Sequence, residues 1–330
     1  MATYKGIQGY SVQKLSSDPT ASEAEGQLWY NSTSGKFKVG TAGAGAWAAG
    51  GNLNTGRNTA GSAGAAASTS MLIFGGNTGS PELITGNTES YNGSAWTETG
   101  HTMNTPRREC GGIGNSQTAA LVGGGYSAPL GGVVANCETY NGSTWTEVNN
   151  ILAAKSGCKT AHAGTSTAGL FYGGSPSTAS NQSWDGTSWT ELADMQTAKG
   201  NQARFGTQTA ALSAGGYSTE RISETETWNG TSWTEVNNLN TARTSFAGAG
   251  STTAGIAYGG DIPGDSAKTE VWDGTSWTEV AALPTAIQAN AGGGASGSAS
   301  ALSTGGNPGY TNATEEWVDP VYTIKTVTVS

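Results

Sequence analysis

The sequence predicts an all-β protein built from six copies of one four-stranded unit, and two recurring features carry that prediction. A Gly-Gly signature recurs once in each of six copies, beginning at Gly75, Gly123, Gly173, Gly215, Gly259 and Gly305. A tryptophan returns every 44 to 49 residues, at Trp47, Trp96, Trp145, Trp189, Trp233 and Trp277. No stretch shows a sustained apolar period of 3.6 residues, so a repeat of this length fits a β-propeller blade better than a helical pair.

The elements of one unit can be followed from residue 244 to residue 280. Two short runs, 244–250 and 254–258, are rich in small and apolar residues, and the second leads into Gly259-Gly260. A polar loop separates them from the third run, 268–272, and the pair Asp273-Gly274 joins that run to the fourth, 275–280. Because Asn-Gly and Asp-Gly tolerate positive φ at both positions, we expect a type I′ hairpin turn there. Each unit is then four antiparallel strands.

The two ends of the repeat region are each incomplete. The aromatic residue of the third strand occurs six times, at Tyr91, Tyr140, Trp184, Trp228, Trp272 and Trp317. The last copy stops after Trp317 without its turn and tryptophan, whereas Trp47 precedes the first Gly-Gly pair. We therefore expect an N-terminal strand around Trp47 to complete the C-terminal blade. Such a strand would close a ring of six and leave no free sheet edge.

Three regions follow from this pattern. Residues 1–44 form an N-terminal anchoring arm in which 27–39 reads as a hairpin turning at Ser34-Gly35, residues 45–320 form the propeller, and residues 321–330 form a C-terminal tail. A lone hairpin is not stable in water, so the arm must pack on a partner or on the propeller. The alternating segment 322–329 predicts one more strand, lying outside the sixth blade or pairing with another subunit.

Composition limits the classes of function. With 52 glycines in 330 residues and 12% charged residues, the chain is typical of a β-rich extracellular or virion protein. A net charge of -9 disfavours nucleic acid as a partner, because phosphate binding needs clustered Lys and Arg. No run of 18 apolar residues predicts a membrane span, and no cationic start with an apolar stretch predicts a signal peptide.

Cysteines and histidines are too few and too scattered for a metal site. Cys110, Cys137 and Cys158 occupy unrelated repeat positions and are expected to be buried thiols. His101 and His162 are the only two histidines. We expect neither a metal nor another cofactor.

Charged residues recur with the repeat. A basic residue precedes most first strands, at Arg57, Arg107, Lys155, Lys199 and Arg243, with Ile287 at the sixth place. An acidic residue lies two before the third-strand aromatic, at Glu89, Glu138, Glu226, Glu270 and Glu315, with Gln182 in the remaining copy. A feature imposed on every unit favours structural pairing over catalysis. The glutamates of the Trp-Thr-Glu segments, such as Glu98, are expected on the outermost, solvated strand.

Binding is expected in the segments that join the second strand to the third, because they vary on a repeated scaffold and emerge on one face of the ring. Those segments are 77–87, 126–134, 175–181, 217–223, 261–267 and 307–314. The candidate ligand-contact residues within them are Tyr126, Tyr217, Arg221, Asp261, Asp265 and Tyr310. In the arm, the candidate residues for anchoring to a partner are Trp29, Tyr30 and Phe37.

The Gly-Gly pair, the later Tyr or Trp, and the Trp five residues after it make residues 45–320 resemble the kelch repeat. The segment 26–37, Gly-Gln-Leu-Trp-Tyr-Asn-Ser-Thr-Ser-Gly-Lys-Phe, resembles one near the N-termini of tail-fibre and other structural proteins of tailed phages, particularly those of marine bacteria. The resemblance implies a non-enzymatic virion protein, a tail-fibre or spike component, that is assembled in the bacterial cytoplasm. It implies attachment through residues 1–44 to other virion proteins, in multiple copies or as a homo-oligomer. The loops of the propeller would then face a host-surface glycan or protein. A capsid-decorating head-fibre protein and a carbohydrate-active enzyme are the alternatives.

Overall fold

A computed structural model describes residues 12–19, 26–42, 45–64, 70–157, 164–293, 300–318 and 322–328. Every regular element in these residues is a β-strand. The chain divides into a small unit, Met1–Gly45 with Asp319–Ser330, and a large unit, Ala46–Val318. The expectations for Cys158 and His162 lie outside the described residues.

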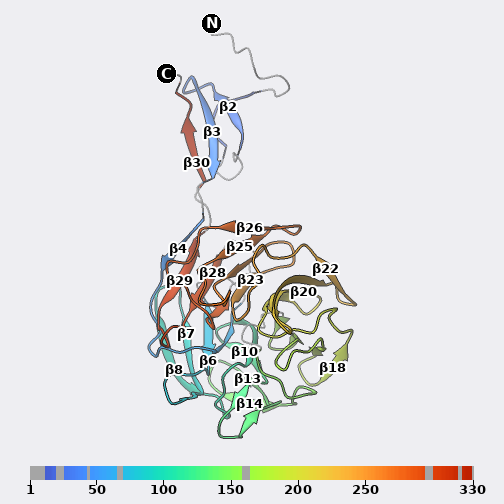
Figure 1. Ribbon diagram of the computed structural model, residues 1–330. Helices are drawn as coiled ribbons and strands as arrows, with labels where there is room; N and C mark the ends of the chain where they lie inside the picture. The colour runs from blue at the N-terminus through green and yellow to red at the C-terminus, as the bar shows by residue number, and fades with distance from the viewer. Residues whose placement is uncertain are drawn as a thin grey trace. The chain divides into compact units, whose positions relative to one another are not determined.

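The large unit contains six four-stranded antiparallel sheets in its described part, and in five of them the strands follow one another in chain order (Figure 1). Sheet 1 is β5 (Gly61–Ala63), β6 (Met71–Phe74), β7 (Asn87–Tyr91) and β8 (Trp96–Thr102). Sheet 2 is β9 (Gly111–Ser116), β10 (Ala119–Gly123), β13 (Cys137–Tyr140) and β14 (Trp145–Val148), with β11 (Tyr126–Ser127) and β12 (Gly132–Val133) paired in its loop. Sheet 3 is β15 (Gly164–Thr165), β16 (Ala168–Tyr172), β17 (Asn181–Trp184) and β18 (Trp189–Leu192).

The second half of the unit repeats the pattern. Sheet 4 is β19 (Ala203–Thr207), β20 (Ala210–Tyr217), β21 (Arg221–Trp228) and β22 (Trp233–Val236). Sheet 5 is β23 (Ala247–Gly250), β24 (Gly255–Tyr258), β25 (Thr269–Trp272) and β26 (Trp277–Val280). Sheet 6 is β27 (Ala291–Gly293), β28 (Ser300–Thr304), β29 (Thr314–Val318) and, from the other end of the unit, β4 (Ala46–Ala49).

Strand β4 completes the C-terminal sheet, which confirms the expectation for the Trp47 segment. It pairs antiparallel with β29, and Trp47 lies opposite Trp317 in the register. The two indole rings pack edge to face with centroids 5.5 Å apart. The pairing joins residues that are far apart in the sequence, so the ends of the large unit hold each other in one sheet.

The first strands of the sheets are tied together by backbone hydrogen bonds that the sequence did not reveal. The amide of Thr59 donates to the carbonyl of Ala289 (2.9 Å), that of Ala289 to Ser245 (2.8 Å), and that of Ser245 to Asn201 (2.9 Å). The series continues from Asn201 to Gly157 (3.0 Å), and Glu109 donates to Thr59 (2.7 Å). These six residues all have positive φ, between 53° and 66°, and precede the first strands of the six sheets. The first strands contact one another in chain order, with β27 beside β5.

Tryptophans of the fourth strands link neighbouring sheets. In four of the sheets, the indole N–H of the fourth-strand tryptophan donates to a threonine in the third strand of the preceding sheet. The pairs are Trp145–Thr88 (2.9 Å), Trp277–Thr225 (3.2 Å), Trp47–Thr269 (3.0 Å) and Trp96–Thr314 (2.9 Å). The last pair joins sheet 1 to sheet 6. Aromatic contacts such as Tyr172–Trp233, with centroids 4.8 Å apart, fill the spaces between sheets. Large rings therefore supply the cores of a chain with few aliphatic residues.

The turn between third and fourth strands differs from the expected type I′ hairpin. Tyr91 pairs with Trp96, so four residues, 92–95, form the connection. Gly93 has φ 95°, but Asn92 does not have positive φ. Its side-chain oxygen instead accepts the amides of Ser94 (3.0 Å) and Ala95 (2.9 Å), which is an Asx turn. The prediction of type I′ was wrong because the Asn or Asp side chain satisfies the turn amides and only the glycine needs positive φ.

The C-terminal strand also differs from its expected place. The small unit is one sheet of β1 (Gln13–Leu15), β2 (Leu28–Asn31), β3 (Lys36–Ala42) and β30 (Tyr322–Thr326). The β2–β3 hairpin turns at 32–35, as predicted, but β30 pairs with β3 and not with sheet 6. Strand β4 already occupies the edge of β29, so the terminal strand instead pairs with the open edge of β3.

Candidate functional site

The recurring basic and acidic residues form buried ion pairs in four sheets. Lys199 pairs with Glu226 at 3.1 Å and Arg243 with Glu270 at 2.9 Å, and Arg57–Glu89 and Arg107–Glu138 make the same contact. All of these side chains are almost completely buried. Burial lowers the pKa of Arg243 to about 10, against the opposing effect of Glu270, so the guanidinium stays charged at neutral pH. Structural pairing was therefore the correct interpretation for these four sheets.

Sheet 5 shows the main bonds around one such pair. Nη1 of Arg243 donates to the carbonyls of Gly259 (3.2 Å) and Lys268 (2.8 Å), and Nη2 donates to Glu270. The other oxygen of Glu270 accepts the backbone amide (2.7 Å) and the side-chain amide (2.9 Å) of Asn240. The carboxylate thus has a cation and two neutral donors, as a buried charge requires.

Sheet 3 carries a neutral version of this arrangement. Gln182 replaces the acid, and its side-chain oxygen accepts the amide of Leu152 (3.0 Å). Lys155 donates its ammonium to the hydroxyl of Ser180. The neutral side chain of Gln182 therefore has a donor for its oxygen although no carboxylate stands at this position.

Sheet 6 breaks the pattern at three donors. Ile287 stands where the arginine is found in sheets 1, 2 and 5, and Pro284 stands where Asn240 supplies both its amides in sheet 5. Proline has neither a backbone N–H nor a polar side chain. As a result Oε2 of Glu315 is buried and has no hydrogen-bond partner in the described part of the chain. Burial raises the pKa of Glu315 above its usual value.

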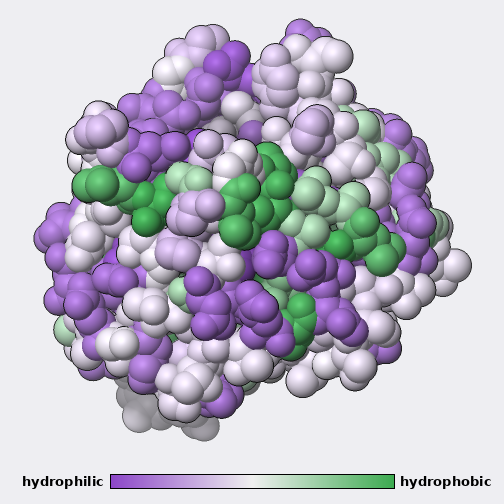
Figure 2. All heavy atoms as spheres, turned by 90° about the horizontal axis from the view of Figure 1, so that it is seen from below, coloured by the Kyte–Doolittle hydropathy of each residue, from purple (hydrophilic) through white to green (hydrophobic). Residues whose placement is uncertain are grey.

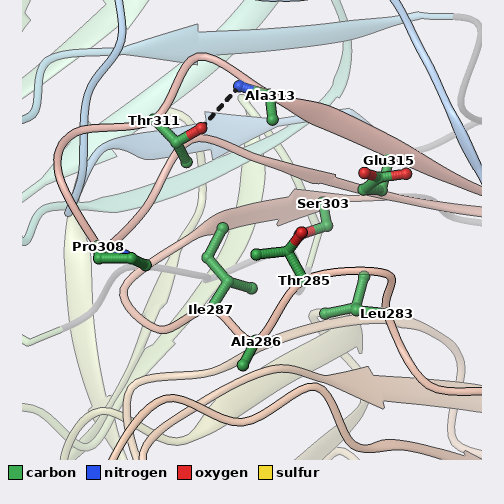
Figure 3. A pocket seen from close by; sticks show the side chains of 9 residues that line it. All are labelled: Leu283, Thr285, Ala286, Ile287, Ser303, Pro308, Thr311, Ala313 and Glu315. Carbon is green, nitrogen blue, oxygen red and sulfur yellow. Dashed lines mark hydrogen bonds between the residues drawn. The ribbon is translucent and has the colours of Figure 1, made fainter.

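A cavity of about 130 Å³ lies beside this carboxylate (Figure 3). Its lining, which we call the Glu315 pocket, consists of Leu283, Thr285, Ala286, Ile287, Ser303, Pro308, Thr311, Ala313 and Glu315. Pro308, Thr311 and Ala313 belong to the segment between β28 and β29. The sequence analysis recorded both Ile287 and Glu315 but missed their consequence. The signal was the simultaneous loss of arginine and asparagine from the 283–287 segment.

The six segments between second and third strands share one end of their sheets, and we call this end the loop face. In each sheet, a residue just before the first strand bridges a residue in or beside that segment, as in Asn58–Asn77, Arg108–Tyr126 and Thr244–Asp261. In an antiparallel meander the start of the first strand and the end of the second lie together. The loops therefore emerge on the same side as the hydrogen-bonded residues around Thr59.

The structure brings four of the six candidate ligand-contact residues together. Arg221 of sheet 4 forms an ion pair with Asp261 of sheet 5 at 2.7 Å. Tyr217 lies opposite Arg221 in the hairpin, and the backbone of Asp265 forms a β-bridge with that of Asp261. Burial raises the pKa of Asp261, but the hydrogen bonds from Arg221 and the amide of Gly264, together with the positive charge of Arg221, outweigh it, so that the pKa is lowered. Tyr217 is 42% exposed. This cluster is the polar and aromatic combination that the loops were expected to present.

The other two candidates lie elsewhere on the loop face. The guanidinium of Arg108 stacks on the ring of Tyr126, 4.5 Å from its centroid, and also pairs with Glu82 at 2.5 Å. Tyr310 is half-buried in the segment that borders the Glu315 pocket. The candidates therefore divide among three places and do not form one site.

Large hydrophobic side chains are exposed on the same loops. Leu83, Leu130 and Val133 are 59%, 57% and 41% exposed. Figure 2 shows a face of the molecule on which hydrophobic residues form a band among hydrophilic ones. Exposed apolar residues beside charged pairs are typical of surfaces that bind other molecules.

In the small unit, one anchoring candidate is internal and two are not. Trp29 is buried, and its indole N–H donates to Asp18 (3.0 Å). Tyr30 and Phe37 lie opposite each other on the other side of the hairpin, with ring centroids 5.2 Å apart, and both are half-buried. Trp29 therefore supports the sheet from inside, whereas the side chains of Tyr30 and Phe37 remain accessible.

Two cysteines and one histidine lie within the described part of the large unit, the cysteines buried and the histidine hydrogen-bonded. Burial raises the pKa of the Cys137 thiol to about 11, which keeps it protonated, and Cys110 is also buried. His101 shares a hydrogen bond of 2.7 Å with Tyr140. Among the described residues, no group of three His, Cys, Asp or Glu side chains is placed to hold a metal ion, and no helix has the length and apolarity to cross a membrane.

Comparison of the chain with protein-family models and with curated proteins finds no match to either. The geometry above is therefore the basis for assigning a function.

Proposed function

We propose that the large unit is a six-bladed, kelch-like β-propeller and that the chain is a structural protein of a phage virion. Three observations support a closed ring: β4 pairs with β29 within sheet 6, and two hydrogen bonds, Thr59–Ala289 and Trp96–Thr314, join sheet 1 to sheet 6. Because the N-terminal strand β4 completes the C-terminal sheet, the ring closes and each blade has a neighbour on both sides.

The role we propose is that of a tail-fibre or spike component that recognises the host surface with its loop face. The observation that carries this proposal is the cluster of Tyr217, Arg221, Asp261 and Asp265, because it combines an exposed ring with paired charges on loops from two different sheets. Aromatic faces and carboxylate–guanidinium pairs are the groups that protein sites offer to sugars and to polar protein surfaces. The blades beneath are repeated and hydrogen-bonded internally, so they act as a scaffold.

Attachment to the particle would use the small unit. Leu28, Tyr30, Phe37 and Val39 lie on one side of its hairpin and are all at least partly exposed. An apolar sheet face of this kind gains stability when another protein covers it. Both ends of the chain contribute strands to this sheet, so the attachment unit is not residues 1–44 alone.

The proposal is tested by locating the chain in purified particles. We expect its peptides in the particles by mass spectrometry and antibody labelling at the tail, and antibodies against the Tyr217–Ser223 loop should block adsorption. Absence from purified particles would refute a virion role. Labelling of the capsid would favour a head-fibre protein, and release of sugars from host polysaccharide by the purified chain would favour a carbohydrate-active enzyme.

Attachment is tested separately with particles that lack the chain. Added full-length protein should co-sediment with them, and the double variant Tyr30→Ser/Phe37→Ser should not. Lys36→Ser, at an exposed position of the same hairpin, is the matched control. Co-sedimentation of the double variant at the level of the control would show that the small unit attaches in another way.

A further inference from the structure

We infer that the Glu315 pocket binds a guanidinium group carried on an aliphatic stem, the chemistry of an arginine side chain. This inference rests on sheet 6 itself and does not depend on the virion role. The pocket belongs to the loop face, where a ligand arriving from outside can reach it.

The other sheets provide the template for the ligand. In sheet 5, Arg243 donates to the carboxylate of Glu270 and to the carbonyls of Gly259 and Lys268, with a longer bond of 3.4 Å to the carbonyl of Ala257. Arg57 in sheet 1 and Arg107 in sheet 2 use the equivalent acceptors, as in the bonds from Arg57 to the carbonyls of Gly75 and Asn87, both 3.1 Å. Three sheets thus hold a guanidinium in the same way.

Sheet 6 keeps this acceptor set. The amide of Gly305 donates to the carbonyl of Ala313 (3.1 Å), as that of Gly259 does to Lys268 (3.0 Å), so the local backbone has the same bonding. Glu315 lies opposite Ser303 in the register, as Glu270 lies opposite Ala257. The carboxylate and the carbonyls of Gly305 and Ala313 therefore occupy the positions that bind arginine elsewhere.

Sheet 6 has no arginine side chain of its own to bind these acceptors. Ile287 is too short to reach the carboxylate, and Pro284 removes the two amide donors that would otherwise satisfy it. A buried carboxylate oxygen without a donor is rare and unfavourable in a folded protein. A guanidinium from outside would satisfy it and would make charge-assisted hydrogen bonds.

The remaining walls fit the stem of such a ligand. Leu283, Ile287 and Pro308 provide apolar contacts along the pocket (Figure 3). The volume of about 130 Å³ is close to the roughly 150 Å³ of an engineered cavity that binds benzene, so a guanidinium with part of its stem can be accommodated. A planar guanidinium has the several donors that these acceptors require, whereas an ammonium is a more strongly hydrated point charge.

The test uses the full-length chain and isothermal titration calorimetry. The probes are N-acetyl-L-arginine amide, its neutral isostere N-acetyl-L-citrulline amide, and agmatine, which has the guanidinium without the peptide group. We expect the arginine compound to bind at least about tenfold more tightly than the citrulline compound. Stronger binding of the arginine compound than of agmatine points to an arginine in a polypeptide, and the reverse points to a small guanidine.

Two variants assign the binding to this pocket. Glu315→Gln should weaken it at least about tenfold because the charge is lost, while Glu279→Gln, at an exposed position, should not change it. Ile287→Arg should abolish binding by filling the pocket from inside and should raise the melting temperature. Equal binding of the arginine and citrulline compounds, no binding of either, or unchanged binding by Glu315→Gln would each overturn the inference. If Ile287→Arg does not fold, the Glu315→Gln result decides alone.

Discussion

Replacement of Arg243 by methionine tests the importance of the buried ion pairs most directly. The change keeps an aliphatic stem of similar length but removes the cation from Glu270, and neither side chain is exposed to solvent. It also removes the bonds to the carbonyls of Gly259 and Lys268. Breaking a buried pair and leaving one charge in place costs about 3–5 kcal/mol, so we expect a loss of unfolding free energy in that range.

A matched control lies in the same sheet. Lys268 pairs with Glu279 at 2.7 Å, but the two side chains are 34% and 53% exposed, so Lys268→Met should cost no more than about 1 kcal/mol. Urea denaturation of the full chain, followed by tryptophan fluorescence, measures both. The double variant Arg243→Met/Glu270→Leu should recover part of the loss, because no uncompensated charge remains. If Arg243→Met is no more destabilising than Lys268→Met, the pairs are not what holds the segments before the first strands in place.

Three further predictions follow from single contacts. Trp96→Phe should lower the free energy of unfolding by about 1 kcal/mol more than Trp233→Phe. The reason is that the indole N–H of Trp96 donates to Thr314, whereas that of Trp233 has no partner among the described residues. Equal losses in urea denaturation would mean that the bond between sheets 1 and 6 contributes nothing to stability. Asn92→Ala should lower the free energy of unfolding by about 1 kcal/mol, because the amides of Ser94 and Ala95 lose their acceptor. Asn92→Asp keeps that acceptor and is the control. Unchanged stability of Asn92→Ala would argue against the Asx turn. The pKa of Glu315 is raised in the folded state. Its favourable contribution to the free energy of unfolding is therefore fully present below the unfolded pKa near 4.5 and is lost as pH rises through the folded pKa. The stability of the wild type relative to Glu315→Gln should decrease over that interval, and a pH-independent difference would contradict the burial of this carboxylate.

The repeat pattern accounts for most of what could be predicted about the fold. The strand order within a unit and the joining of Trp47 to Trp317 follow from counting which strands each end lacks, because an antiparallel sheet with a missing strand leaves unsatisfied backbone groups. In five sheets, both glycines of the Gly-Gly pair that marks the repeat have positive φ. In sheet 2 the two glycines with positive φ are Gly124 and Gly125, one residue after the start of the pair at Gly123, since three successive glycines do not by themselves specify which two adopt that conformation.

The sequence was less informative about contacts between elements. The pairing of β30 with β3 depends on which sheet edge is open, and a short alternating segment contains no information about its partner. The hydrogen-bonded series through Thr59, Asn201 and Ala289 involves backbone groups, so residues as different as Thr, Glu, Asn and Ala occupy equivalent positions. A pattern search based on side chains therefore cannot detect it.

For the candidate site, the sequence identified the participants but not their arrangement. It determined by itself that basic and acidic residues recur in nearly every unit and that Ile287 departs from the rule, because these are facts of position along the chain. Only the tertiary structure decided that Arg243 and Glu270 are buried together, that Arg221 meets Asp261 from the next sheet, and that Glu315 faces a cavity without a donor. The physical reason is that burial and pairing depend on which segments meet in space, and the energy of a charge is set by those neighbours far more than by its place in the sequence.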